Sequence, residues 1–454
     1  MKTTNRSFRA TALALAVLGT LAAGQASASG FQLREQSVKN LGKSNAGSIV
    51  GKDASNVSLN PAAMTNLDKT TIQVDNTVID LTADFAGSGR ILGSAHPSAG
   101  LTGGNGGDPG DATLVPNMSV VVPLSGALEG MTVGASIGAP FGLKTEYEQG
   151  WVGRYRALTS DVKVVDLTLS AAFKATEGVS LGFGLVYERA EATLSKAVDF
   201  GTAICASGNP ANCFNTQYPF KPQQLDGAFE VSGDATGIGY IVGMQVAPTD
   251  KLAIGFSHRS EIKHDLEGDL DFQNVPALLA ADPRFQDGPG GARLVTPAIT
   301  TLSVMYGFTD SFRVLADYQA TNWSSLQNVT IKRASGTVVG AEDFSWDDTD
   351  FVSVGVEYDI SDAFTLRAGV GQDESPTNDA TRTPRLPDND RMLYSIGASW
   401  NVSEHLTVDA AFQRITIDDP SINLGVHAPS DLSTLVGTYS GHANLIGFSA
   451  QYRF

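Results

Sequence analysis

Hydrophobic and polar residues alternate with a period of two from Thr70 to the end of this 454-residue chain. In VDLTLSAAFK (165–174), alternate positions are apolar and those between them are mostly polar, while in LGFGLVYER (181–189) the second face is rich in glycine. This period predicts β-strands with one apolar face. About fourteen segments show it, and they cover 70–82, 114–124, 129–139, 161–175, 178–190, 228–247, 251–262, 297–309, 311–321, 346–360, 363–372, 391–402, 405–417 and 440–454.

The connections between these segments alternate between tight turns and long loops. The long ones cover 83–113, 140–160, 191–227, 263–296, 322–345, 373–390 and 418–439. Short turns on one side, long loops on the other and an even number of strands are typical of an outer-membrane barrel. The predicted fold class is all-β, a transmembrane antiparallel β-barrel of about 14 strands.

The two faces of the segments distinguish this fold from a soluble β-sandwich, in which charged residues would point outward. The apolar face collects aromatic residues beside the short turns, as at a membrane interface: Phe173, Phe308, Phe312, Tyr358, Phe364 and Trp400. The other face carries charges that suit a polar lumen: Asp166, Glu188, Arg313, Asp317, Glu357, Asp359, Arg367, Arg391 and Asp409. The last segment also ends on an aromatic residue, Phe454, on its apolar face.

Residues 1–28 have the pattern of a secretory signal peptide. Three basic residues precede an apolar run over residues 10–23, and the Ala-Ser-Ala of 26–28 suits cleavage. Removing these three positive charges takes the formal net charge from −17 to −20, which argues against a nucleic-acid partner. Export also allows Cys205 and Cys213 to form a small loop-closing disulfide, with two free thiols as the alternative.

Residues 29–68 precede the first strand segment and have no strand to join. A barrel of about 14 strands is too wide for its own side chains to fill. We therefore expect 29–68 to fold into the lumen as a hatch and 69–454 to form the barrel. Within the hatch, Asn60-Pro61-Ala62 provides a fixed bend. The same triplet at 209–211 is expected in a surface loop, so position distinguishes the first copy.

Several segments resemble, in order, the FadL-type outer-membrane transporters, which take up long-chain fatty acids and, in the TodX-like branch, aromatic hydrocarbons. SGFQLREQSVKNLGKSNAG and ASNVSLNPAAM resemble the hatch region of that family, and APFGLKTEY, HRSEIKHDLEG, TNWSS, QDESPT and LPDNDRMLYSIG resemble later segments. The resemblance covers essentially the whole mature chain. It implies a fourteen-stranded barrel with a hatch, ligand capture between external loops, a luminal pocket and lateral release through the barrel wall. Asn60, Pro61 and Ala62 match the hatch motif whose movement is thought to open the route.

The lateral opening is expected in the third strand segment. There Gly134 and Gly138 thin the wall, and Pro140, followed by Phe141, removes a donor from the strand ladder. The alternative is that Pro140 only ends the strand at the outer rim.

The capture groove is expected between the third and fourth long loops. The first of these contributes Phe214, Tyr218 and Phe220, and NVPALLAADPRF in the second predicts a short helix with Val275, Leu278 and Leu279 along one side. Exposed apolar groups on both loops would form a hydrophobic patch suited to ligand capture. The alternative is that they only roof the barrel.

A fatty acid also needs a partner for its carboxylate, which an inward arginine provides through charge-assisted hydrogen bonds. Arg259 and Arg391 are the candidates, with Arg313 and Arg367 also facing inward. Each has acidic neighbours, so a structural ion pair is the alternative.

Together these patterns predict a monomeric outer-membrane importer of hydrophobic small molecules, surrounded by lipid and lipopolysaccharide. Long-chain fatty acids are the first choice of ligand, and aromatic or aliphatic hydrocarbons the second. We expect no cofactor or metal, because the six histidines lack metal-binding spacing. An outer-membrane hydrolase using His427 or His442 lacks a nucleophile motif, and a general porin would need no hatch.

Overall fold

The computed structural model describes residues 30–426 and 431–454, so the predicted signal peptide lies outside the described residues. Antiparallel strands form one closed β-barrel of 14 wall strands, in which the last strand pairs with the first. The wall strands are β1 (Thr71–Ile91), β2 (Thr113–Pro123), β3 (Met131–Glu146), β4 (Thr159–Thr176), β5 (Val179–Asp199), β6 (Asp226–Thr249), β7 (Leu252–Arg259), β10 (Ile299–Gly307), β11 (Phe312–Thr321), β14 (Thr349–Ser361), β15 (Phe364–Asp373), β16 (Arg391–Asn401), β17 (Leu406–Ile417) and β19 (Ser433–Arg453). The predicted fold class is confirmed.

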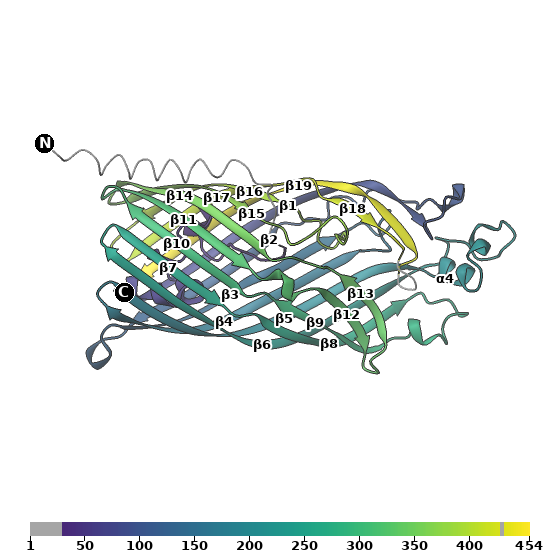
Figure 1. The fold of residues 1–454 in the computed structure, drawn as a ribbon, viewed down its shortest axis with the longest axis horizontal. Helices are drawn as coiled ribbons and strands as arrows, with labels where there is room; N and C mark the ends of the chain where they lie inside the picture. The colour runs from purple at the N-terminus through teal and green to yellow at the C-terminus, as the bar shows by residue number, and fades with distance from the viewer. Residues whose placement is uncertain (1–29, 427–430) are drawn as a thin grey trace.

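Five further strands lie where long loops were expected, which corrects that part of the prediction. They are β8 (Ile262–Gln273), β9 (Gly288–Thr296), β12 (Asn328–Arg333), β13 (Val338–Asp343) and β18 (Ser421–Leu424). β8, β9, β12 and β13 continue the barrel toward the loop end, as Figure 1 shows. The outward faces of β8 and β9 are charged rather than apolar, as where Arg293 Nε lies 2.7 Å from Asp265 Oδ1, so no apolar face marks these two strands in the sequence.

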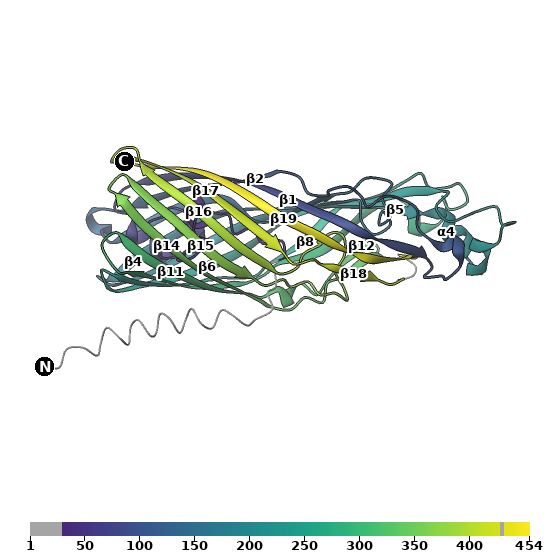
Figure 2. The same cartoon turned by 90° about the horizontal axis from the view of Figure 1, so that it is seen from above.

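Short helices lie in several of the connections. They are η2 (Pro97–Ala99), η3 (Gly126–Leu128), α4 (Phe200–Ala206), η4 (Pro210–Phe214), η5 (Pro283–Phe285) and η6 (Trp323–Ser325). α4 lies at the end of the barrel opposite the C-terminus in both views (Figures 1 and 2). No helix in the described ranges is long and apolar enough to cross a membrane.

The outer surface carries an apolar band between two rows of aromatic residues. Beside the short turns, Phe173, Phe308, Tyr358, Phe364 and Trp400 are 45–52% exposed. Nearer the loops, a row of exposed tyrosines comprises Tyr187, Tyr240, Tyr318 and Tyr394. Such rows mark the two membrane interfaces. The polar surface beyond the tyrosines, including β8, β9, β12 and β13, therefore lies outside the hydrocarbon layer.

The hatch, described from Gly30 onward, packs against the inner faces of the wall strands. It contains α2 (Val38–Leu41), α3 (Asn56–Leu59) and η1 (Pro61–Asn66). Figure 1 shows it in purple, inside the half of the barrel near the C-terminus. Asn60 begins η1 because its side chain accepts a hydrogen bond from Ala62 N (3.2 Å) and Pro61 fits the first helical position.

Candidate functional site

The barrel wall is interrupted between β2 and β3. These strands pair with each other only up to Met118 and Ile137. Beyond that level β2 still pairs with β1, and β3 still pairs with β4, but β2 and β3 do not pair with each other. A bulge of two residues, Ala139 and Pro140, interrupts the β3 register at this point. A bulge bends its strand and proline cannot donate to the ladder, so together they account for the separation.

The residues expected at a lateral opening divide into two groups. Gly138, Pro140 and Phe141 lie at the interruption. Gly134 instead pairs with Val121 of β2 and with Ser170 of β4, so it lies below the interruption.

The start of the hatch runs along the free edge of β3. Leu33 N donates to Pro140 O at 2.8 Å, and Gly142 N donates to Phe31 O at 2.9 Å. Residues 31–33 thus occupy hydrogen-bonding positions that β2 leaves empty. A free strand edge readily accepts an added strand, and the start of the hatch covers the edge of β3 from the inside.

Gln36 links the two sides of the interruption. Its Nε2 donates to Ala139 O of β3 at 2.8 Å, and its Oε1 accepts from Asn117 Nδ2 of β2 at 3.0 Å. A single hatch side chain therefore connects the strands that do not pair directly.

A cavity of about 550 Å³, which we call the wall cavity, lies at the interruption. Hatch residues such as Phe31 and Leu33 line it from within, and Leu114, Met118 and Ile137 line it toward the outer face. These last three side chains are exposed on the apolar band. The wall cavity therefore joins the lumen to the lipid-facing surface.

Two further cavities lead from the wall cavity toward the loops. The middle cavity, about 90 Å³, shares Phe31, Leu143, Val162 and Leu386 with the wall cavity. The outer cavity, about 280 Å³, lies near α4, and its aromatic lining residues are Tyr155, Phe229, Phe272 and Phe285. It shares Leu194, Ile331, Glu342 and Arg385 with the middle cavity. The three cavities thus form a largely apolar series from the loop end to the wall.

Arg385 places a positive charge where the outer and middle cavities meet. Its Nε donates to Glu342 Oε1 at 3.0 Å, and its Nη1 donates to Thr159 O at 3.1 Å and to Ser160 Oγ at 3.2 Å. Its Nη2 makes no hydrogen bond to any described residue. An arginine held on one side and open on the other can bind a carboxylate. No sequence pattern marks Arg385, because it lies in a loop without strand alternation.

The arginines chosen from the sequence are already paired. Arg259 hydrogen-bonds Asp166 and Glu188. Arg391 lies 2.7 Å from Asp388. Arg391 lines the wall cavity, whereas Arg259 does not.

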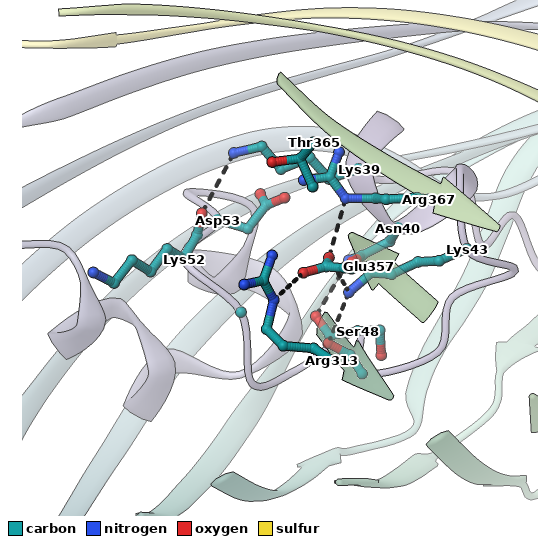
Figure 3. A network of polar contacts seen from close by, with 12 residues as sticks. Lys39, Asn40, Lys43, Ser48, Lys52, Asp53, Arg313, Glu357, Thr365 and Arg367 are labelled. Carbon is teal, nitrogen blue, oxygen red and sulfur yellow. Dashed lines mark hydrogen bonds and ion pairs between the residues drawn. The ribbon is translucent and has the colours of Figure 1, made fainter. Parts of the chain in front are cut away.

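The remaining two inward arginines belong to a buried ionic network between hatch and wall (Figure 3). Glu357 accepts from Arg313 Nε and Arg367 Nε, each at 3.0 Å, and Lys43 of the hatch lies 3.6 Å away. Burial lowers the pKa of Lys43, and the charge of Glu357 opposes that shift. The network fixes the hatch to β11, β14 and β15.

The Asn60-Pro61-Ala62 motif fits a socket made by two paired glycines, Gly182 of β5 and Gly243 of β6. A Cβ at Gly182 would lie 2.4 Å from Ala62 N, and one at Gly243 would lie 1.9 Å from Asn60 Oδ1. Any larger residue would displace the motif. Asn60 Nδ2 also donates to Ile49 O at 2.9 Å, so the motif joins two parts of the hatch to the wall.

Residues 147–158 were expected in an external loop but fold into the lumen, and we call them the inner loop. Trp151 is fully buried and stacks on Tyr147, with ring centroids 4.1 Å apart. Tyr147 Oη also lies 2.8 Å from Tyr439 Oη of β19. Burying these rings against β19 makes the inner loop a second plug at the loop end of the barrel.

The loop residues expected to capture ligand lie away from these three cavities. Phe214 stacks on His96, with ring centroids 4.8 Å apart, and Tyr218 contacts Phe220. The helix expected around Val275, Leu278 and Leu279 is wrong: that stretch forms turns, followed by the short η5. Pro283 disfavours the helical conformation at the residue before it, so a helix could not continue past this point, and a helix this short gains little stability from its own hydrogen bonds.

Cys205 and Cys213 form a disulfide in the same surface lobe. It joins α4 to η4 with a Cα–Cα distance of 4.9 Å. The bond therefore closes a small loop at the barrel end opposite the C-terminus.

Comparison with known proteins agrees with this geometry. Residues 19–454 match the model of the outer membrane protein transport protein family, OMPP1/FadL/TodX. The chain belongs to this family. It is 28% identical to outer membrane protein P1 of Haemophilus influenzae, with both chains fully covered, and 27% identical to the long-chain fatty acid transport protein of Escherichia coli K12, covering 91% of this chain and 93% of that one.

Solved structures give the same result. A FadL homologue from Pseudomonas aeruginosa superposes with a TM-score of 0.85 at 26% identity, covering 94% of this chain and 100% of the other. The toluene transporter TodX of Pseudomonas putida shares the fold, with a TM-score of 0.65 at 17% identity, covering 91% and 97%. The protein is thus an outer-membrane β-barrel of a family that transports hydrophobic compounds, and it is not an enzyme.

Proposed function

We propose that this protein takes up long-chain fatty acids passively and releases them sideways into the outer membrane. The series of outer, middle and wall cavities carries the proposal, because it leads from the loop end to the lipid-facing surface, with the start of the hatch lining its last part. Its apolar lining suits an alkyl chain, and Arg385 suits a carboxylate at the entrance to the middle cavity.

In this proposal the outer cavity captures the ligand, and the loop aromatics Phe214, Tyr218 and Phe220 shape the surrounding lobe. The ligand then passes Arg385 and leaves through the opening at Gly138, Pro140 and Phe141. Displacement of residues 31–36 from the edge of β3 opens the exit, while the Asn60-Pro61-Ala62 motif keeps the rest of the hatch seated.

Each barrel contains a complete route, which supports a monomeric transporter. The charged outer surface above the tyrosine row would lie among lipopolysaccharide head groups. Neither the apolar cavities nor the buried inner loop suits a general porin, whose lumen must hold water.

The proposal can be tested by locking the interruption with a reversible bond. A Cβ at Gly138 would lie 3.4 Å from Asn117 Cγ, so an Asn117→Cys/Gly138→Cys pair can bridge β2 and β3. Val120→Cys/Ala135→Cys links residues that already pair below the interruption and is the matched control.

Cells carrying each variant would be given labelled oleate and labelled toluene. We expect the first pair alone to abolish oleate uptake when oxidised, with recovery after reduction. The wild type is treated identically, since reduction also opens its native disulfide. Toluene uptake without oleate uptake would assign the protein to hydrocarbons. Free passage of small hydrophilic solutes, with uptake of neither ligand, would refute the importer.

A further inference from the structure

The hatch carries a buried acid, Glu35, that no feature of the barrel explains. It lines the wall cavity next to the interruption, and only 6% of its surface is exposed. Among the described residues, no ion pair involves it and no other residue donates a hydrogen bond to its carboxyl group. An acid left unpaired in an apolar cavity is costly to keep for structure alone.

The charged groups facing Glu35 come from the hatch, β15 and the start of β16, and they are already paired with one another. Arg34 lies 2.7 Å from Asp373, and Arg391 lies 2.7 Å from Asp388. The two arginines are thus already balanced by two aspartates, so ionising Glu35 would add a negative charge that no cation balances.

The burial of Glu35 also changes its acidity. Burial raises the pKa of Glu35 from 4.5 to about 7, and the charges of Arg391 and Arg34 only partly oppose that shift. A carboxyl with this pKa is protonated in part of the population at neutral pH. It can therefore act as a proton donor there.

A fatty acid that leaves through the wall cavity must first lose the negative charge of its carboxylate. Its carboxylate is charged in water, but a charged group entering hydrocarbon is costly, so the neutral acid is the form that crosses into lipid. The wall cavity is the last space before the lipid-facing surface. Glu35 lies there, whereas Arg385 lies earlier on the route, where the outer and middle cavities meet and a charged ligand is favoured.

We propose that Glu35 protonates the carboxylate of a fatty acid in the wall cavity just before lateral release. The proton bonds to a ligand oxygen as the Glu35 O–H bond breaks, which yields a neutral fatty acid and the Glu35 carboxylate. Glu35 then regains a proton from water in the lumen. The net reaction is uptake of one proton per fatty acid released. This inference rests on the proposed function.

The test uses the full protein in lipid vesicles and measures delivery of labelled oleate and of oleyl alcohol between pH 5.5 and 8.5. The two ligands share a chain, but only oleate needs a proton. The variants are Glu35→Gln, which removes the acid, and Glu35→Asp, which keeps it. Asp111→Asn is the control, because Asp111 lines the same cavity at its exposed rim, 2.7 Å from Lys144. Migration of unboiled samples on a gel checks that each variant is folded.

We expect Glu35→Gln to slow oleate delivery at least about tenfold near pH 7 and to leave oleyl alcohol unchanged. Glu35→Asp and Asp111→Asn should deliver both ligands. Equal oleate delivery by Glu35→Gln and the wild type at every pH would overturn the inference, as would equal slowing of both ligands. If the wild type delivers neither ligand, the proposed function itself fails, and that result is distinct from the other two.

Discussion

Replacing Arg385 by glutamine should separate binding of a carboxylate from binding of an alkyl chain. Three of its hydrogen bonds hold the side chain against Glu342, Thr159 and Ser160, and Nη2 remains for the ligand. A hydrogen bond to a charged group contributes about 1.5–3 kcal/mol. Losing it should weaken oleate binding by about 10-fold to 150-fold.

The assay is equilibrium binding of oleate and oleyl alcohol to the detergent-solubilised protein. Oleyl alcohol should bind the variant within about threefold of the wild type, because the apolar lining is unchanged. Glu342→Gln should strengthen oleate binding, since Glu342 competes for the guanidinium at 3.0 Å. Arg313→Gln is the matched control: it removes an inward arginine that lies in the ionic network and lines none of the three cavities.

An equal loss of affinity for both ligands would show that Arg385 only supports the surrounding backbone. Unchanged oleate binding would refute the assignment of Arg385 as the carboxylate partner. Either result would leave the apolar cavity series as the basis for a hydrocarbon transporter.

Three further predictions concern stability. Gly243→Ala should destabilise the protein by about 1–3 kcal/mol, because the added Cβ would meet Asn60. Thermal unfolding tests this, with Gly340→Ala as the control, because a Cβ at Gly340 would meet nothing within 4 Å. Glu357→Gln should cost about 3–5 kcal/mol in urea unfolding, since three cations lose their shared carboxylate; an unchanged midpoint would contradict the role of the network. Because the pKa of Glu35 is raised in the folded protein, Glu35 contributes about 3 kcal/mol of stability below about pH 4.5, and this contribution is lost as the pH rises through about 7. The unfolding temperature of Glu35→Gln should therefore change less between pH 4.5 and 7 than that of the wild type.

The barrel could be predicted from the sequence because the lipid-facing side of every membrane strand must be apolar. Leu167, Leu169 and Phe173 must be apolar where they face hydrocarbon, and this repeats around the wall. Above the membrane the rule ends. Arg293 and Asp265 face water on β9 and β8, so those strands resembled loops.

The sequence indicates the site only where a single residue changes the backbone hydrogen bonding at its own position. Pro140 indicated a break in β3 because its missing donor acts at its own position. Arg385 and Glu35 have no such local signal: each matters because distant segments bring a cavity to it. The socket of Gly182 and Gly243 likewise depends on the register between β5 and β6, which alternation alone does not specify.

The length of β5 and β6 has a consequence for where the protein meets its ligand. They contain 21 and 24 residues, and at a usual tilt the longer one extends about 60 Å along the barrel axis, against about 25 Å for an apolar band. The entrance therefore stands well beyond the hydrocarbon layer. Under the proposed function, a ligand is therefore captured from water rather than from the membrane.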